Sequence, residues 1–386
     1  MLRSAHFSPH PAAAILAAAL VPLAASGQQD LKREPGGWSR TLTMSVAPQP
    51  RLVIEAHGPV TLESGVSSDI QYTVKFGVAV QDEAEARRIL GILGLRVRQS
   101  QGTVTLLPPG GAVLTTVWVK APRLDAATIL TSGGGVEVRG IDGTLSVDAV
   151  GDLQVDRVGG DCTLFTGGGN IKAGHMGGSL RCTTRAGRIE VISARGEATL
   201  ATDGGDIVGG QMGGPVHAHT GAGNVLVVSA SAAVDASTGG GEIQVVRALG
   251  VVTARNVLGP VTVGGARGVQ CENASGGVRV GNIMGPMRVS TAVGSIVANL
   301  LGSRIADSLL ATGNGDITVA VPSNVGVTIR ADNELSDTMR RITSEFPAIR
   351  AHRQGTHLVA EGPVNGGGPV LQIAASGGTI YIKRQK

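Results

Sequence analysis

Apolar residues recur every nine positions over about half of the chain. The run is most regular from Ile171 to Val261, where each ninth residue is apolar or alanine. Around these positions apolar residues alternate with others, as in Ile189-Glu190-Val191 and Ile243-Gln244-Val245. Alternation with a period of two indicates a short β-strand with one buried face. The sequence therefore predicts many short strands at regular spacing.

Two such strands form one larger repeat of 18 residues. The step has a single-residue slip near Val269 and a small insertion before Ile317. A strand of about four residues and a turn of about five fit a parallel β-solenoid, in which successive coils stack in register. From Val136 to Ile317 we expect about ten 18-residue coils of two short strands each. The aligned units are residues 160–171, 178–189, 196–207, 214–225, 232–243, 250–261 and 285–296.

Side-chain size and direction follow from this register. Val225 should point into the core and Leu226 outward, because neighbouring residues of a strand face opposite sides. Glycine-rich links such as residues 166–169 are expected to use positive φ, which glycine adopts readily. Alanines at inward positions indicate a narrow interior; they are Ala173, Ala198, Ala218, Ala236, Ala254 and Ala298.

The flanks of the repeat differ from it and divide the chain into four parts. Residues 1–27 are predicted to be a signal peptide, 28–130 a β-rich cap with one helix, 131–320 the solenoid, and 321–386 a C-terminal cap with closing strands. The first cap's helix is expected around residues 82–90, with acids before bases. A second helix is expected near residues 334–345. Caps are needed because a solenoid exposes unpaired edges at both ends.

The N-terminus has the features of a secretory signal. Arg3 precedes an apolar run from Ala12 to Ala25, and small residues lead to a cleavage site predicted after Gly27. The run is shorter than the ~20 residues that span a membrane. We therefore expect a periplasmic or secreted protein, with no membrane insertion after cleavage.

The composition limits the kinds of core and of partner that the protein can have. Glycine accounts for 59 of 386 residues and aromatics for only 2%, so the core must be built from small aliphatic side chains. The net charge is +4, without a basic block, which argues against nucleic acid as a partner. The three cysteines fall at inward positions. By the register, Cys162 and Cys182 lie roughly 8 Å apart, too far for a disulfide, so we expect three buried, unpaired thiols.

The sequence resembles a large bacterial family of β-strand-repeat proteins, a domain of unknown function labelled "putative adhesin". The resemblance lies in QDEAEARRIL (81–90), in the repeats TGGGNI, TDGGDI, STGGGEI and TGNGDI, and in the closing segment GPVNGGGPVLQIAASGGTIYIKR (362–384). It covers most of residues 40–386. It implies a β-solenoid and, by analogy, adhesion, and it carries no catalytic motif.

Calcium-binding nonapeptide repeats share the nine-residue period and must be considered. In those repeats an Asp stands two residues after the last Gly, where this chain has apolar residues such as Ile171 and Ile207. Arg188 would also lie within the ligand column. Acids at the strand entrances, which are Asp161, Asp206, Glu242 and Asp316, are better explained as partners of turn backbones. We expect no calcium.

The sequence also gives little support for a transition-metal site or for a catalytic site. His217 and His219 could reach one metal, but their neighbours in adjacent coils offer only Asp235 in support, which favours an exposed surface pair. The outward columns Thr163, Arg181, Thr199, His217, Asp235, Thr253, Gln270, Arg288 and Lys172, Glu190, Val208, Leu226, Gln244, Thr262, Arg279, Val297 hold no close pair of acids. We therefore predict no catalytic, cofactor-binding or metal-binding residues, and no cofactor.

The expected function is that of a non-enzymatic, exported β-solenoid, a structural or adhesion module at the bacterial cell envelope. Its partner would be an unknown envelope protein or surface ligand. The alternatives are a solenoid-type polysaccharide-processing enzyme and an envelope-stress signalling partner. Val208 and Leu226 add a small outward apolar strip, which would be either a partner contact or a packing site for a flank.

Overall fold

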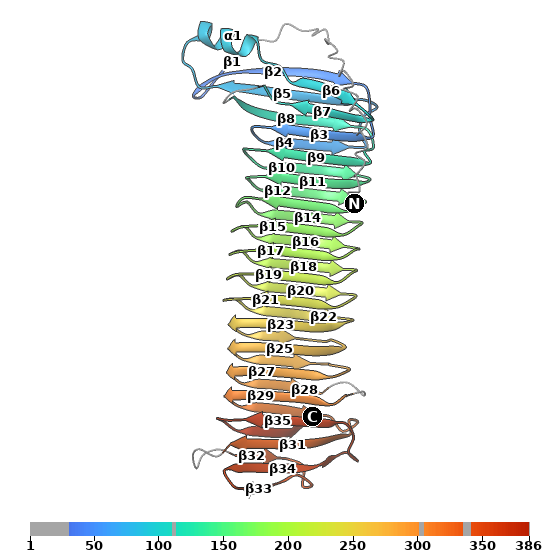
Figure 1. The fold of residues 1–386 in the computed structure, drawn as a ribbon, viewed down its shortest axis with the longest axis vertical. Helices are drawn as coiled ribbons and strands as arrows, with labels where there is room; N and C mark the ends of the chain where they lie inside the picture. The colour runs from blue at the N-terminus through green and yellow to red at the C-terminus, as the bar shows by residue number, and fades with distance from the viewer. Residues whose placement is uncertain (1–30, 110–112, 301–304, 335–340, 386) are drawn as a thin grey trace, which may run out of the picture.

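The computed structural model describes residues 31–109, 113–300, 305–334 and 341–385. The chain forms a long shaft of stacked β-coils with a cap at each end (Figure 1). The predicted parallel β-solenoid is confirmed, with about eleven turns where about ten were expected. The predicted signal peptide lies outside the described residues. In the described part of the chain, no helix is long and apolar enough to cross a membrane.

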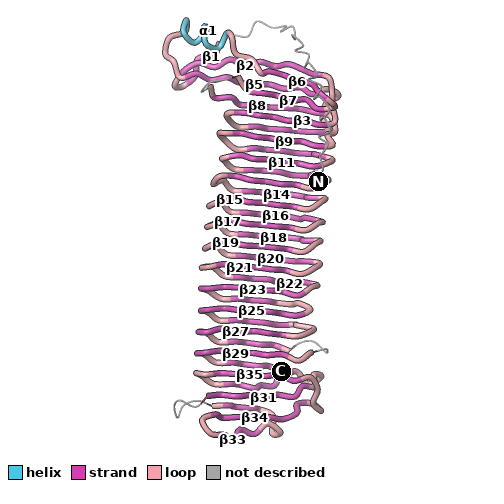
Figure 2. Tube along the Cα trace, in the orientation of Figure 1, coloured by secondary structure: helices cyan, strands magenta, loops and turns pink. Residues whose placement is uncertain are grey.

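Each coil of the shaft contributes one strand to each of two sheets, and short loops join the sheets at both edges (Figure 2). The first sheet contains, in the shaft, β10 (Val136–Ile141), β12 (Leu153–Val158), β14 (Ile171–Met176), β16 (Ile189–Ala194), β18 (Ile207–Met212), β20 (Val225–Ala230), β22 (Ile243–Ala248), β24 (Val261–Val263), β26 (Val278–Gly281), β28 (Ile296–Asn299) and β30 (Ile317–Val321). The second contains β9 (Ala126–Thr131), β11 (Thr144–Ala149), β13 (Cys162–Thr166), β15 (Leu180–Thr184), β17 (Ala198–Thr202), β19 (Val216–Thr220), β21 (Val234–Thr238), β23 (Val251–Leu258), β25 (Gly268–Ser275), β27 (Met287–Val293) and β29 (Ser308–Asn314).

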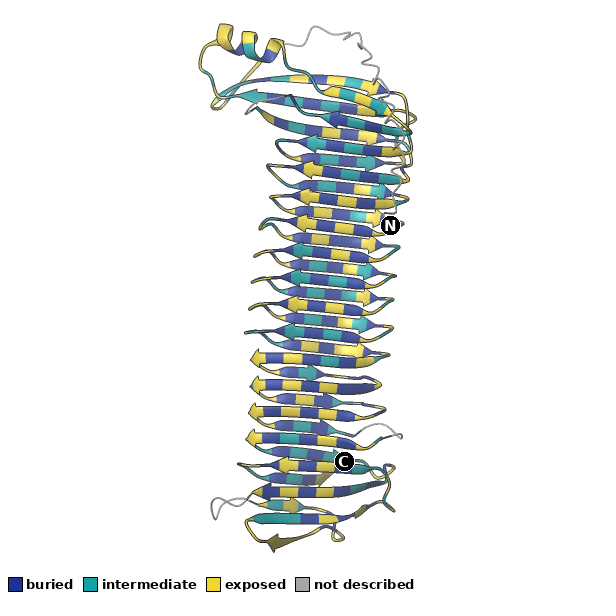
Figure 3. Ribbon diagram, in the orientation of Figure 1, coloured by how far each residue is buried: buried dark blue, intermediate teal, exposed yellow. Residues whose placement is uncertain are grey.

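The strands pair in parallel, and residues 18 apart are direct partners. Ile207 pairs with Val225, which pairs with Ile243 in the next coil. The slip is a coil of 17 residues, which pairs Val252 with Val269. Along each strand buried and exposed residues alternate (Figure 3). Val225 is 1% exposed and Leu226 is partly exposed, as the register predicted, and the six inward alanines are all buried.

The N-terminal cap closes the upper end of the shaft in Figure 1. Its strands β3 and β4 precede β7 and β8 in sequence, yet they lie between those strands and the first coil of the shaft. β2, β5 and β8 pair antiparallel above them. The strands are β1 (Lys32–Glu34), β2 (Gly37–Val46), β3 (Arg51–Ala56), β4 (Val60–Ser64), β5 (Ile70–Val78), β6 (Arg96–Ser100), β7 (Thr103–Leu107) and β8 (Leu114–Ala121).

The predicted helix of this cap is α1 (Glu83–Gly91). It begins after Asp82, whose side chain accepts a hydrogen bond from the Glu85 N–H at 3.2 Å, an ordinary N-cap. Ala86 and Leu90 are its buried residues. At its other end Arg40 donates to the carbonyls of Leu90 at 2.7 Å and Gly91 at 3.1 Å, which helps to satisfy the C-terminal carbonyls of the helix.

In the C-terminal cap, as in the N-terminal cap, two strands lie between the shaft and cap strands that are closer to the shaft in sequence. The last two strands, β35 (Val370–Ala375) and β36 (Ile380–Arg384), lie between the final coil of the shaft and the cap strands β31 (Val327–Glu334) and β32 (Ile342–Ser344). β34 (His357–Val364) and β33 (Arg350–Gln354) pair antiparallel beyond β31. The prediction of a helix near residues 334–345 was wrong. Glu334 ends β31, residues 342–344 form a strand, and residues 335–340 lie outside the described part.

The glycines of the shaft turns are needed for a different reason than the one predicted. In the described turns, Gly167, Gly168 and Gly169 do not have positive φ. A Cβ on Gly187 or Gly205 would collide with the backbone of the glycine one coil earlier. The turns therefore stack too closely for any side chain at these positions. Positive φ occurs at other glycines of the shaft, for example at Gly134 in an early coil and at Gly259 and Gly294 in later ones.

Candidate functional site

A long groove runs along the edge where the strands of the second sheet end, from β19 to β27. We call it the corner groove; it encloses about 820 Å³. A recess of about 340 Å³ shares Ser290 and Thr291 with it and continues towards the C-terminal cap. The walls and floor of the corner groove are formed by His219, Thr220, Gly221, Ser237, Thr238, Gly239, Arg255, Asn256, Val257, Glu272, Asn273, Ala274, Ser290, Thr291 and Ala292.

One wall of the corner groove is polar. It consists of one outward residue from each coil, and these residues are direct partners in the ladder: His219, Ser237, Arg255, Glu272 and Ser290. Two contacts between coils fix their positions. His219 Nδ1 lies 2.8 Å from the Ser237 hydroxyl, and Arg255 Nη1 lies 3.3 Å from Asp235 Oδ1. Hydrogen-bonding groups thus repeat at the spacing of the coils.

The other wall is small and apolar. It is made by residues at or just after the ends of the same strands; among these, Ala274 and Ala292 are exposed and Val257 is 54% exposed. Leu258 and Val293, two coils apart beside this wall, are also more than half exposed. The corner groove therefore offers an apolar surface on one side and donors and acceptors on the other.

The floor is a buried polar column that the sequence analysis did not find. Thr220 donates to the Gly205 carbonyl of the previous coil at 2.8 Å and accepts from the Gly223 N–H at 3.1 Å. The same pattern recurs in neighbouring coils through Thr166, Thr184, Thr202 and Thr238. A threonine every 18 residues, three before a glycine, was the available signal.

Two asparagines replace threonine in this floor. The side-chain amides of Asn256 and Asn273 each donate to two turn carbonyls. Their Oδ1 atoms are buried and have no hydrogen-bond partner among the described residues. A buried acceptor without a partner costs about 1–3 kcal/mol, so these two coils are the least satisfied part of the column.

Three of the four acids at the strand entrances, Asp161, Asp206 and Asp316, act as predicted, as partners of the backbone. Among the described residues, the Glu242 carboxylate accepts no backbone hydrogen bond. Asp206 Oδ1 accepts from the Asn224 N–H one coil on at 2.8 Å, and Asp161 does the same for Ser179. Asn224 in turn accepts from the Glu242 N–H at 2.8 Å. These side chains form a ladder that runs parallel to the strand ladders.

The histidine pair lies on the exposed face of β19. His217 faces Glu197 at 3.7 Å, and His219 faces Ser237, so the two rings have different partners. In the described ranges, no group of three or more His, Cys, Asp or Glu residues is arranged to hold a metal ion. That the protein needs no metal stays a prediction.

The outward column from Thr163 to Arg288 is confirmed by the register, rung by rung. The column from Lys172 to Val297 is confirmed as well. Beside Val208 and Leu226, the exposed residues Ile192, Val228 and Val246 widen the apolar strip. The described flanks lie at the ends of the shaft and not over this strip (Figure 1).

All three cysteines are buried and unpaired. Cys182 pairs in the ladder with Leu164, while Cys162 pairs with Leu180, which is the diagonal placement predicted. Burial raises the pKa of Cys162 and Cys271 to about 12 and that of Cys182 well above its ordinary value. The thiols therefore serve as small apolar side chains.

Comparison with known proteins gives structural likenesses only. No family model matches the chain, and no curated protein matches it. It is similar to a crystal structure of a putative cell adhesion protein from Clostridium sporogenes, with 10% identity over 90% of this chain and 100% of that one and a TM-score of 0.20. Putative adhesins from Bacteroides fragilis (12%, 90% and 97%, TM-score 0.27) and Parabacteroides distasonis (13%, 70% and 97%, TM-score 0.28) are also similar.

These names are of the class that the sequence resemblance indicated. At such identities and scores the likenesses carry no argument about function. The fold assignment rests on the strand pairing described above, and the functional argument must rest on this chain's own surface.

Proposed function

We propose that this chain is exported and serves as a non-catalytic structural or adhesion module at a bacterial cell envelope. Cleavage after Gly27 would release it into the periplasm or the medium. The signal-like N-terminus supports export, and the corner groove supports a binding role. The groove is the single observation on which the binding role depends.

The shape of the corner groove favours an extended ligand. It is open along its length and crosses five successive strands of the second sheet, β19 to β27. An enzyme requires acids and bases that converge on one reacting atom. Here the polar residues are instead distributed one to a coil, with Glu272 next to Arg255 in the ladder. Such spacing suits a long partner held by many weak contacts.

The test uses the purified chain from residue 28 onward, immobilised and exposed to envelope fractions and to a panel of neutral and acidic glycans. Ala274→Trp places a bulky side chain at the apolar wall. Ala233→Trp makes the same change at an exposed turn outside the groove. We expect the first variant to lose at least tenfold in affinity and the second to bind normally.

Chemical turnover is followed in the same samples. Breakdown of a glycan that disappears in Glu272→Gln would contradict the proposal and favour the polysaccharide-processing alternative. Equal binding by Ala274→Trp and the unchanged chain would remove the corner groove as the binding surface.

A further inference from the structure

A second groove lies at the other kind of edge, where strands of the first sheet end. We call it the arginine groove; it encloses about 670 Å³ and crosses the ends of β4, β10, β12, β14 and β16. It shares no residue with the corner groove. It is lined by Ser64, Gly65, Val66, Arg123, Gly140, Ile141, Asp142, Arg157, Val158, Gly159, His175, Met176, Gly177, Ser193 and Arg195.

Three arginines and one acid line this groove. The side chains of Arg123 and Arg157 are 85% and 67% exposed, and Arg195 is exposed as well. The acid is Asp142, and Asp156 lies next to the groove. Among the described residues, Arg195 has no ion pair within 4.0 Å.

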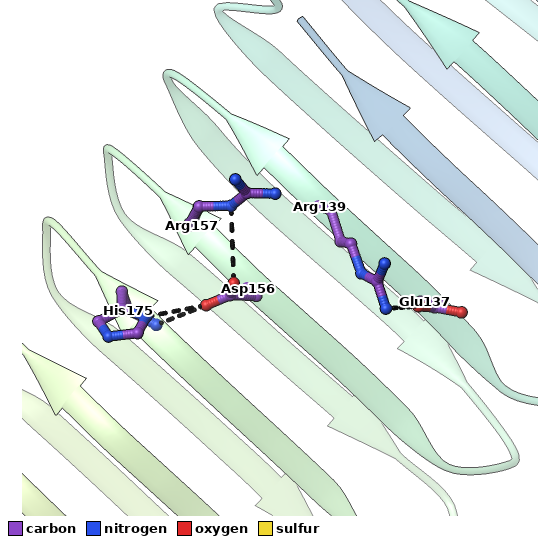
Figure 4. A network of polar contacts seen from close by, with 5 residues as sticks. All are labelled: Glu137, Arg139, Asp156, Arg157 and His175. Atoms are coloured by element: carbon purple, nitrogen blue, oxygen red, sulfur yellow. Dashed lines mark hydrogen bonds and ion pairs between the residues drawn. The ribbon is translucent and has the colours of Figure 1, made fainter. Parts of the chain in front are cut away.

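The two acids leave most of the guanidinium donors available. Asp142 faces Nε of Arg123 at 3.5 Å, and Asp156 faces Nε of Arg157 at 3.6 Å. Both distances exceed the 2.7–2.9 Å of a strong charge-assisted hydrogen bond. Figure 4 shows the two terminal nitrogens of Arg157 pointing away from Asp156. The planar fork that recognises carboxylate, sulfate and phosphate is thus presented outward.

The position of Asp156 is fixed by the next coil. Its Oδ1 accepts hydrogen bonds from the backbone N–H of His175 at 3.1 Å and faces His175 Nδ1 at 3.0 Å (Figure 4). It occupies the space where a Cβ on Gly174 would lie. Any other residue at 174 would displace the carboxylate. Asp156 is therefore held in place beside Arg157.

Arg157 itself has an unusual backbone. Its φ is +57°, in the left-handed region that favours glycine. Gly140, its neighbour one coil earlier, has φ +83° at the same edge. The chain thus has an arginine where glycine would be the least strained choice, and strained backbone of this kind concentrates at functional sites.

We propose that the arginine groove binds a linear anionic glycan, with Arg157 and Arg195 holding its carboxylate, sulfate or phosphate groups. The two arginines are separated by about two coils, roughly 10 Å along the shaft. The groove is open at the surface and crosses five strand ends, so a passing chain fits it better than an enclosed small molecule. This inference names a second site and a ligand class and does not depend on the corner groove.

Binding is measured with the chain from residue 28 onward against heparin and polygalacturonate, with dextran as the uncharged glycan and with polyphosphate and duplex DNA as polyanions that are not glycans. The variant Arg157→Gly, Arg195→Ala removes both arginines and relieves the strained φ. Arg279→Ala removes an exposed cation of the same sheet outside the groove. Gln101→Gly relieves a φ of +48° in the N-terminal cap.

We expect at least one of the two anionic glycans to bind, and the double variant to bind it at least tenfold more weakly and with a shallower salt dependence. Arg279→Ala and Gln101→Gly should bind normally. Because glycine suits position 157, the double variant should melt no lower than the unchanged chain. The polymer bound identifies the anionic group.

Three outcomes would overturn the proposal. One is that neither anionic glycan binds at low salt, or that dextran binds equally well. Another is that Arg279→Ala weakens binding as much as the double variant, which would indicate a general effect of net charge. The third is that polyphosphate or duplex DNA binds more tightly than either anionic glycan through the same two arginines.

Discussion

The carboxylate of Asp316 accepts a hydrogen bond from the backbone N–H of Thr379 at 2.7 Å, across 63 residues of sequence. Elsewhere in the shaft the same contact joins residues 18 apart, as between Asp206 and Asn224. Ile317 and Ile380, one residue further along, are direct partners in the ladder. The last strands of the chain therefore take the place of the next coil, and the cap closes beyond them.

Asp316→Ala should loosen this junction. It leaves the Thr379 N–H without its side-chain acceptor, which costs about 1 kcal/mol in free energy of unfolding. Asp316→Asn keeps an acceptor oxygen and serves as the control. Hydrogen exchange should show faster exchange in β35 and β36 of Asp316→Ala, with the mid-shaft strands unchanged. Equal exchange in both variants would mean that the contact contributes nothing.

The structure of the shaft could be predicted because its sequence repeats, whereas the strand order of the caps could not. From Ile171 to Val261 every coil faces a near copy of itself, so the register follows from the spacing alone. In the caps the rung order departs from the chain order, because β3–β4 and β35–β36 insert beside strands that precede or follow them at a distance. No period in the sequence records such an insertion. The helix wrongly expected near residue 334 came from this gap in the pattern.

The inside and outside of the strands can be separated by substitution. Val225→Asp places a charge among buried aliphatic side chains and should cost several kcal/mol. Leu226→Asp changes a partly exposed residue on the outer face of the same strand and should have little effect. Urea unfolding of both variants measures the difference. Similar losses in both would contradict the two-sided strand.

The three thiols should not react with thiol reagents until the protein unfolds. Burial raises the pKa of Cys162 and Cys271 to about 12, so neither forms a thiolate near pH 8 in the folded state. An aromatic disulfide reagent should find no reactive group in the native protein and three in the unreduced, unfolded protein. A single group after unfolding would mean that Cys162 and Cys182 are bridged.

The same burial gives a stability loss at high pH. The folded pKa of each thiol lies above the unfolded value near 8.5. Below about pH 8.5 the thiols are protonated in both states and full stability is present; as the pH rises towards 12, the unfolded chain ionises first and stability falls. Replacing the three cysteines with alanine should flatten that part of the profile.

Asp156 gives the opposite pH dependence. Burial raises its pKa, but hydrogen bonds from His175 and the charges of His175 and Arg157 lower it more, so it lies below the ordinary 3.8. Its contribution is present above the unfolded pKa and is lost as the pH falls through the folded one. The melting temperatures of the unchanged chain and Asp156→Asn should differ at pH 6, and the gap should shrink only as the pH falls below about 4. A constant gap would contradict this.

The grooves could not have been predicted from the spacing. The corner groove lies between the small side chains of Ala274 and Ala292 and the polar column in the same strands, an arrangement that appears only when the coils are stacked. Arg157 was not noticed because nothing in its sequence context shows a positive φ. The threonine column was visible as a repeat, but its meaning depended on carbonyls one coil away.

The threonine column provides the sharpest test of how the turns are held. Thr220→Val keeps the shape of the side chain but removes the donor to the Gly205 carbonyl and the acceptor for the Gly223 N–H. Both backbone groups would be left buried without that partner, at a cost of about 1–3 kcal/mol each. Thr220→Ser retains the hydroxyl and should lose less than half as much. If the valine and serine variants have the same melting temperature, the glycine turns are held by strand pairing alone. The polar floor of the corner groove then has no role in stability.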